Sequence, residues 1–195
     1  TDYASHDSPV HEAAALPVML PTKLLGRDAA LAQIYPSLKQ GRSVLVYGAP
    51  GTGKTALAAA LATAYAQQPG GVLWLNVDND SLESLIVRVG RAYHLTEISS
   101  ADNPLGMVGA AASTLMQHKP LIVLDGRISA QVAAKFISRC ADRLPVLIVS
   151  REQLEGGGWA ELRLPLLEPS YAVALFKQES MINDNSHDAA IESIV

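Results

Sequence analysis

The chain has 195 residues, of which 49% are hydrophobic and 17% are charged, and its formal net charge is −4. This length fits one domain, or one domain with part of another, and the apolar fraction is enough for a sizeable core. There is no basic tract to indicate direct nucleic-acid binding, and a single cysteine, Cys140, excludes an internal disulfide.

The two ends of the chain carry little information on the core. Residues 1–20 are predicted to be a linker or tail, because they are mostly small or polar and follow no helical or strand period. They do not resemble a secretory signal, and no apolar run is long enough to cross a bilayer. We therefore expect a cytoplasmic protein with no membrane partner. The last residues, 187–195, have a helical pattern without a cap or breaker, so we expect that the sequence is part of a longer one.

Five apolar runs have the composition of strands. They cover residues 43–48, 71–77, 120–125, 145–150 and, more weakly, 161–167. The first four are almost continuous in apolar or β-branched residues, which is typical of parallel strands buried on both faces.

Helical patterns lie between these runs. They cover residues 55–67, 81–93, about 103–118 and 128–142, and a further one covers 171–181. Asp80 and Glu83 stand where a capping pair would begin the second of these helices. Alternating strands and helices predict an α/β fold with three layers and a five-stranded, mainly parallel sheet.

The sequence GAPGTGKT follows the first strand and opens a helix. Gly48, Gly53, Lys54 and Thr55 match the phosphate-loop pattern of P-loop NTPases, whose glycines let backbone N–H groups point at phosphate oxygens. Lys54 is expected to reach the β- and γ-phosphates, and the Thr55 hydroxyl to bind Mg²⁺. The alternative is a glycine-rich turn that holds no ligand.

Asp125 ends the third predicted strand, at the edge where an α/β sheet places its ligand chemistry. It is expected to hold Mg²⁺ with Thr55, and the alternative is an aspartate that caps the next helix. The next residue is Gly126, whereas many hydrolytic P-loop enzymes have a second acid there to position the attacking water. We therefore expect slow hydrolysis. Asp78 or Asp80 could supply a base instead, although a turn and a helix cap explain both residues as well.

Arg151 follows the fourth strand and would point into the same cleft. A guanidinium suits a γ-phosphate because its donors fork onto oxygens. The alternative is a surface arginine paired with Glu152 or Glu155.

Together these segments resemble the NB-ARC ATPases of the STAND class, which include plant immune receptors, apoptosome ATPases and bacterial regulators. LLGRDAAL (residues 24–31) is similar to the entry motif of that family, and GAPGTGKT to its phosphate loop. GGVLWLNV, LIVLD and VLIVSRE are similar to its second strand, its Mg²⁺ strand and its sensor strand. Residues 162–176 are similar to the stretch that leads into a helical domain.

The resemblance implies a set of site residues. Leu25 and Arg27 would flank the adenine, Arg151 would sense the γ-phosphate, and Lys54, Asp125 and Arg151 would form the catalytic group. The implied nucleotide-binding residues are Leu25, Arg27, Gly48, Pro50, Gly51, Thr52, Gly53, Lys54, Thr55 and Ala56. The implied metal ligands are Thr55 and Asp125, for Mg²⁺ bound with ATP or ADP.

The resemblance also implies domains and a function. Residues 21–167 would form the nucleotide-binding domain, and 168–195 would start a helical subdomain. We expect an ATP/ADP switch that self-associates in its ATP state and acts through effector and sensor domains outside this chain. An AAA+ ATPase of the origin-recognition or loader type is the alternative. A small-molecule kinase is disfavoured because the sequence has no Arg-rich lid, and a nucleotide-binding module without turnover stays open.

Overall fold

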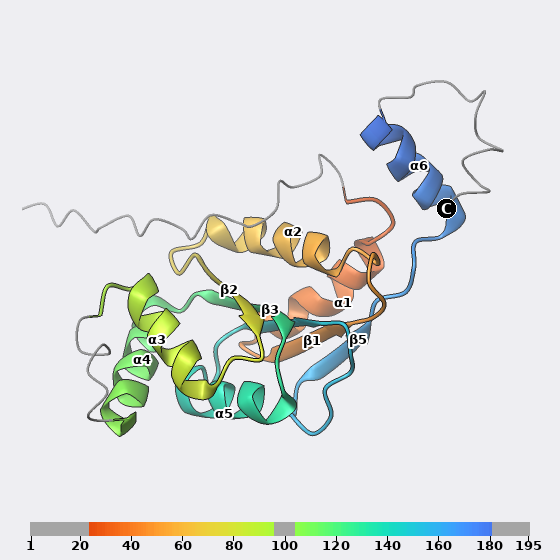
Figure 1. Ribbon diagram of the computed structural model, residues 1–195. Coiled ribbons are helices and arrows are strands. Elements are labelled where there is room, and N and C mark those ends of the chain that lie inside the picture. The colour runs from red at the N-terminus through yellow and green to blue at the C-terminus, as the bar shows by residue number, and fades with distance from the viewer. Residues whose placement is uncertain (1–23, 96–103, 181–195) are drawn as a thin grey trace, which may run out of the picture.

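The computed structural model describes residues 24–95 and 104–180, in which five strands form one sheet between two layers of helices (Figure 1). In chain order the elements are α1 (Asp28–Lys39), β1 (Ser43–Tyr47), α2 (Lys54–Ala66), β2 (Val72–Asp78), α3 (Leu82–Ala92), α4 (Pro104–His118), β3 (Leu121–Arg127), α5 (Ala130–Cys140), β4 (Val146–Ser150), β5 (Ala160–Arg163) and α6 (Pro169–Ser180). The predicted three-layer α/β fold with a five-stranded sheet is confirmed. None of the helices in the described part of the chain is long and apolar enough to span a membrane.

The strand order in the sheet is β2-β3-β4-β1-β5, and every pairing is parallel. Because β4 lies between β1 and β3, Tyr47 of β1 is opposite Ser150, and Asp125 of β3 is opposite Val149. The carboxyl ends of the three strands therefore end side by side at one edge of the sheet. This edge is where open α/β sheets bind their ligands.

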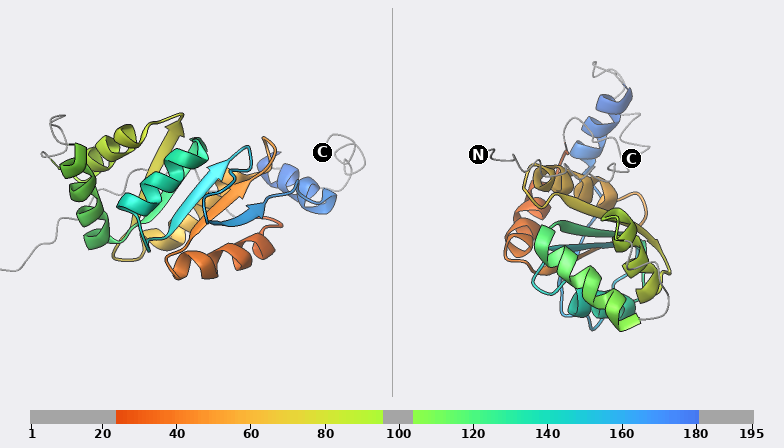
Figure 2. Two further views of the ribbon diagram at one scale, coloured as in Figure 1. Left: turned by 90° about the horizontal axis from the view of Figure 1, so that it is seen from below. Right: turned by 90° about the vertical axis from the view of Figure 1, so that its left-hand side faces the viewer.

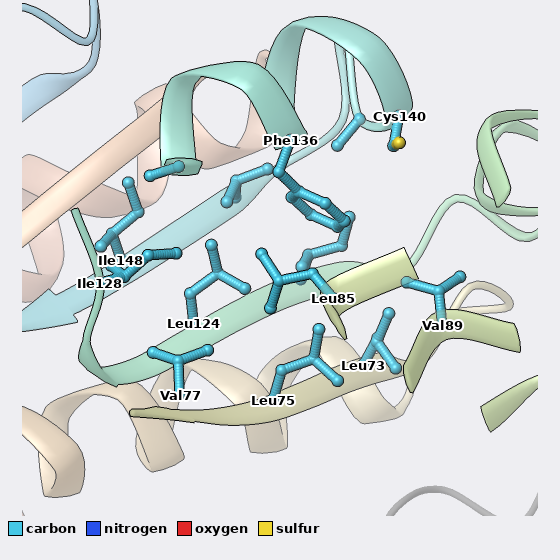
Figure 3. Packing of buried hydrophobic residues seen from close by; sticks show 14 of the residues in the cluster. Leu73, Leu75, Val77, Leu85, Val89, Leu124, Ile128, Phe136, Cys140 and Ile148 are labelled. Carbon is cyan, nitrogen blue, oxygen red and sulfur yellow. The ribbon is translucent and has the colours of Figure 1, made fainter. Parts of the chain in front are cut away.

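Both faces of the sheet are buried, since alternate side chains of each central strand enter two separate cores. One core joins the sheet to α3, α4 and α5, and Figure 3 shows Phe136 of α5, Leu85 of α3 and Leu124 of β3 within it. The other core joins the opposite face to α1 and α2 and includes Leu57 and Trp74. Burial of each large apolar side chain contributes roughly 1.5–3 kcal/mol, so these cores hold the strand ends in fixed positions.

The first helix, α1, is not predicted by the sequence patterns above. It contains Pro36, and a proline inside a helix removes one backbone hydrogen bond. Ile34 and Leu38 on the same helix are fully buried against the core next to α2. This tertiary burial offsets the local cost of the proline.

Some predicted boundaries are wrong by a few residues. Ser81, not Asp80, is the N-cap of α3, and its side chain accepts a hydrogen bond from the backbone N–H of Ser84. Strand β3 does not end at Asp125 but continues to Arg127, because β2 pairs with it over that length. Strand β5 ends at Arg163 instead of residue 167. The predicted tail (1–20) and the helical pattern at 187–195 lie outside the described residues.

The segment after β5 turns back toward the start of the described chain. The backbone N–H of Leu164 donates to the carbonyl of Tyr47, 2.7 Å away, and residues 164–168 then lead into α6. The ring of Tyr171 on α6 packs against Gly26, where a Cβ atom would lie 2.7 Å from two ring carbons. Otherwise α6 projects away from the sheet (Figure 2).

Candidate nucleotide-binding site

A cleft of about 690 Å³ opens at the carboxyl edge of the sheet. Its walls are the loop between β1 and α2 and the ends of β2, β3 and β4. Its polar side chains are those of Lys54, Thr55, Asp78, Asp125, Arg127, Ser150 and Arg151. Several groups that the sequence places far apart are thus brought to one cavity.

The loop between β1 and α2 has the backbone shape that phosphate binding needs. Gly51 and Gly53 have φ angles of 80° and 85°, a region that other residues rarely adopt. Gly53 is the N-cap of α2, so the positive end of this helix faces the cleft. Backbone N–H groups and a helix N-terminus together form a typical anion site.

Lys54 is held inside this loop. Its ammonium group donates to the carbonyls of Gly48 at 2.9 Å and Ala49 at 2.7 Å, and only 8% of the residue is exposed. Burial lowers the pKa of Lys54, repulsion from Arg151 lowers it further, and Asp125 opposes both effects. The loop therefore holds a buried cation beside the anion site.

Thr55 and Asp125 meet across the cleft. The Thr55 hydroxyl donates to Oδ1 of Asp125 at 3.4 Å, and both residues are half-buried. Burial raises the pKa of the Asp125 carboxyl, against the effects of the Thr55 hydrogen bond and the Lys54 charge. A hydroxyl and a partly desolvated carboxylate next to a phosphate loop are oxygen ligands of the kind that Mg²⁺ takes, so these residues fit that ion.

Arg151 also reaches the cleft. Its side chain is exposed and lines the cavity, and its charge acts on Lys54. In the described ranges it forms no ion pair with Glu152 or Glu155. Ser150 before it is buried, and its hydroxyl accepts a hydrogen bond from the backbone N–H of Glu152 at 3.1 Å. The turn after β4 is thus fixed while the guanidinium stays available.

Arg27 and Leu25 are not among the residues that line the cleft. Arg27 is 6% exposed and contacts the phosphate loop without lining the cleft. Its Nη2 donates to the carbonyl of Thr52 at 2.7 Å and to the carbonyl of Pro165 at 2.9 Å. Burial lowers its pKa. The guanidinium therefore ties the phosphate loop to the segment that leads into α6, a link that the sequence did not indicate.

Of the residues predicted to bind nucleotide or metal, most face the cleft. These are Pro50, Gly51, Gly53, Lys54, Thr55, Ala56, Asp125 and Arg151. Gly48 and Thr52 lie in the same loop but do not line the cavity, and Thr52 is buried, with its hydroxyl donating to the carbonyl of Ala49 at 3.0 Å.

The two candidate bases, Asp78 and Asp80, have different places in the structure. Asp78 lines the cleft and pairs with Arg127, which sequence reasoning did not single out. Asp80 does not line it, but accepts hydrogen bonds from the Ser84 hydroxyl at 2.5 Å and from Arg88 at 3.2 Å at the start of α3. The Ser84 hydrogen bond is the main cause that lowers the pKa of Asp80. Its position indicates a structural role.

Comparison with known proteins agrees with this geometry. The AAA ATPase domain family matches residues 23–155, which is more than half of the chain, so the chain belongs to this family of nucleotide-binding ATPase domains. No curated protein is a significant sequence match.

Among solved structures, Cdc6p from Pyrobaculum aerophilum has a TM-score of 0.71 at 14% identity, over 90% of this chain and 55% of that one. A STAND protein with a tetratricopeptide repeat sensor from Pyrococcus horikoshii has a TM-score of 0.62 at 17% identity, over 91% and 29%. The ORC2 protein of Aeropyrum pernix, solved as ADPNP–ADP complexes, has a TM-score of 0.60 at 16% identity, over 85% and 54%. At these identities the likeness shows the P-loop NTPase fold alone, and this chain spans about half or less of each of those proteins.

Proposed function

We propose that this chain is the nucleotide-binding part of an ATP/ADP switch of the NB-ARC type within the STAND ATPases, with slow hydrolysis. The observation that carries the proposal is the buried Arg27 guanidinium between the carbonyls of Thr52 and Pro165. A switch needs a contact between the nucleotide loop and a part that moves, and this contact joins the loop to the segment before α6.

The coupling depends on a differential contact. A γ-phosphate would interact with Arg151 in the ATP state, whereas in the ADP state Arg151 would have no phosphate contact and Lys54 would keep only its contact with the β-phosphate. If these interactions shift the phosphate loop, the Thr52 carbonyl moves with it. Arg27, which binds both carbonyls, would transmit that movement to Pro165. Tyr171, packed on Gly26 next to Arg27, would move with them.

The metal and the hydrolysis rate follow from the same site. When bound, Mg²⁺ would neutralise charge on the phosphate oxygens, and Thr55 and Asp125 are the residues that would hold it. Gly126 has no side chain that could position the attacking water, and for this reason we propose slow turnover. Leu25 and Arg27 remain proposed neighbours of the adenine.

The domain and partner proposals follow from this function. Residues 1–20 would be a linker, 21–167 the nucleotide-binding domain and 168–195 the start of a helical subdomain. The ATP form would self-associate and act on effector and sensor domains outside this chain.

The test is the nucleotide that co-purifies with the protein, released by denaturation and identified by ion-exchange chromatography. We expect about one equivalent of bound ADP, because such switches typically rest in the ADP state. Lys54→Ala should purify without this ADP. Lys135→Ala, an exposed lysine on α5, is the matched control and should keep the nucleotide. A protein that comes without nucleotide and turns ATP over quickly would refute the switch.

An AAA+ ATPase of the origin-recognition or loader type is the second candidate, favoured by the TM-score of 0.71 with Cdc6p. The two proposals differ in one property that is easy to measure. A loader would bind DNA with an affinity that falls steeply as salt rises, because lysine and arginine contacts release phosphate counterions. DNA binding of this kind would favour the loader, and its absence at low salt would favour the switch.

A further inference from the structure

The position after Asp125 is closed to any side chain. Gly126 has a φ angle of 135°, and a Cβ atom there would lie 2.1 Å from the carbonyl oxygen of Val77 on the neighbouring strand. That contact arises because Val77 and Gly126 are paired in the β2–β3 ladder. With this backbone, a second acid directly after Asp125 would clash with β2, so another residue has to supply any acid that positions the water.

Asp78 is the carboxylate that the neighbouring strand provides. Two carboxylates, Asp78 and Asp125, line the cleft, and Asp125 is engaged by the Thr55 hydroxyl. Asp125 is opposite Asn76, so Asp78 lies one strand away and two residues further toward the open edge. With strands about 4.8 Å apart and a rise of about 3.3 Å per residue, the two Cα atoms are roughly 8 Å apart. The two carboxylates therefore lie at the same end of the sheet, and both line the cleft.

Arg127 holds Asp78 by one oxygen only. Its Nε donates to Oδ1 at 2.9 Å, and its Nη2 lies 2.7 Å from the same oxygen. Asn79 also donates to Oδ1, at 3.4 Å, and no described residue donates to Oδ2. Since 73% of the Asp78 side chain is exposed, Oδ2 is open to water. An exposed ion pair of this kind adds little to stability, but it limits the orientations of the Asp78 carboxylate.

We propose that Asp78, oriented by Arg127, positions the attacking water in ATP hydrolysis, in place of an acid after Asp125. This rests on the proposed nucleotide function of the cleft. The water oxygen bonds to the γ-phosphorus while the bond from that phosphorus to the β,γ-bridging oxygen breaks, and its electron pair leaves with ADP. Oδ2 of Asp78 accepts the water proton and later releases it to solvent, so the products are ADP, phosphate and one proton. Arg127 is a positioning residue.

The test compares Asp78→Asn with wild type in single-turnover ATP hydrolysis and in ATP and ADP binding. The matched control is Asp142→Asn, which alters another exposed aspartate–arginine pair, with Arg143, at the other edge of the sheet. We expect Asp78→Asn to slow hydrolysis about 100-fold, as loss of general-base catalysis does, with nucleotide affinity nearly unchanged. Arg127→Gln should slow hydrolysis less, and Asp142→Asn should match wild type.

A second readout does not depend on turnover. ADP with aluminium fluoride imitates the phosphoryl group as the water attacks, whereas ADP with beryllium fluoride imitates bound ATP. Asp78→Asn should lose tight capture of the first complex and retain the second.

The outcomes separate the two proposals. If Asp78→Asn binds nucleotide, hydrolyses ATP at the wild-type rate and captures both complexes, the role of Asp78 is refuted and the nucleotide switch stands. Wild-type protein that binds ATP without any hydrolysis refutes this role as well. Wild-type protein that binds no adenine nucleotide refutes both proposals.

Discussion

Replacing Arg27 by methionine tests the link between the phosphate loop and the segment before α6. Methionine keeps much of the apolar stem but removes the two hydrogen bonds to the carbonyls of Thr52 and Pro165. A hydrogen bond from a charged group contributes about 1.5–3 kcal/mol, so two contribute about 3–6 kcal/mol. The cost of burying the guanidinium, visible in its lowered pKa, offsets part of this. We expect a net loss of about 2–4 kcal/mol in the free energy of unfolding.

Urea denaturation of Arg27→Met and wild type, followed by circular dichroism, measures this difference. Arg42→Met is the control, because Arg42 is exposed, and its replacement should change stability by less than about 0.5 kcal/mol. If Arg27→Met loses less than about 1 kcal/mol, the guanidinium does not tie the two segments together.

Three further predictions concern single residues. Lys54→Ala should raise the Kd for ADP by about 10- to 100-fold in calorimetry, because one charged contact with phosphate is lost; an unchanged Kd would contradict the site. Gly126→Ala should cost more than about 2 kcal/mol of stability in urea, whereas Gly109→Ala, with nothing near its added Cβ, should cost nothing or stabilise α4. Burial raises the pKa of the Cys140 thiol from 9.0 to about 11, so the folded state favours the neutral thiol. The neutral thiol contributes fully to the free energy of unfolding below pH 9. This contribution, up to about 3 kcal/mol, is lost as the pH rises through about 11. The stability of Cys140→Ala should therefore fall less over that range than that of wild type, and equal slopes would contradict it.

The sequence predicted the elements whose signals are local. The first four strands along the chain, β1 to β4, are recognised by continuous apolar residues, because parallel strands covered on both faces need them. The phosphate loop is recognised because eight consecutive residues carry both its shape and its chemistry. The places of Asp125 and Arg151 in the cleft were predicted because both lie near the carboxyl ends of strands that the sheet brings together.

What the sequence did not predict depends on contacts between distant residues. Helix α1 is stabilised by tertiary burial of Ile34 and Leu38, which outweighs the local signal of Pro36. The Arg27 link joins residues 138 positions apart, and no local pattern indicates that partner. The Asp78–Arg127 pair depends on the register of β2 and β3, which continues past the predicted end of β3.

If the proposed switch operates, the bound nucleotide controls the segment attached to the phosphate loop through Arg27. Hydrogen exchange of the backbone amides in residues 164–180, with ADP and with a non-hydrolysable ATP analogue, tests it most directly. We expect exchange in this segment to differ between the two nucleotides in wild type. Arg27→Met should abolish the difference at concentrations that saturate the variant with either nucleotide. Identical exchange with the two nucleotides in wild type, at saturation, would show that the nucleotide does not control this segment.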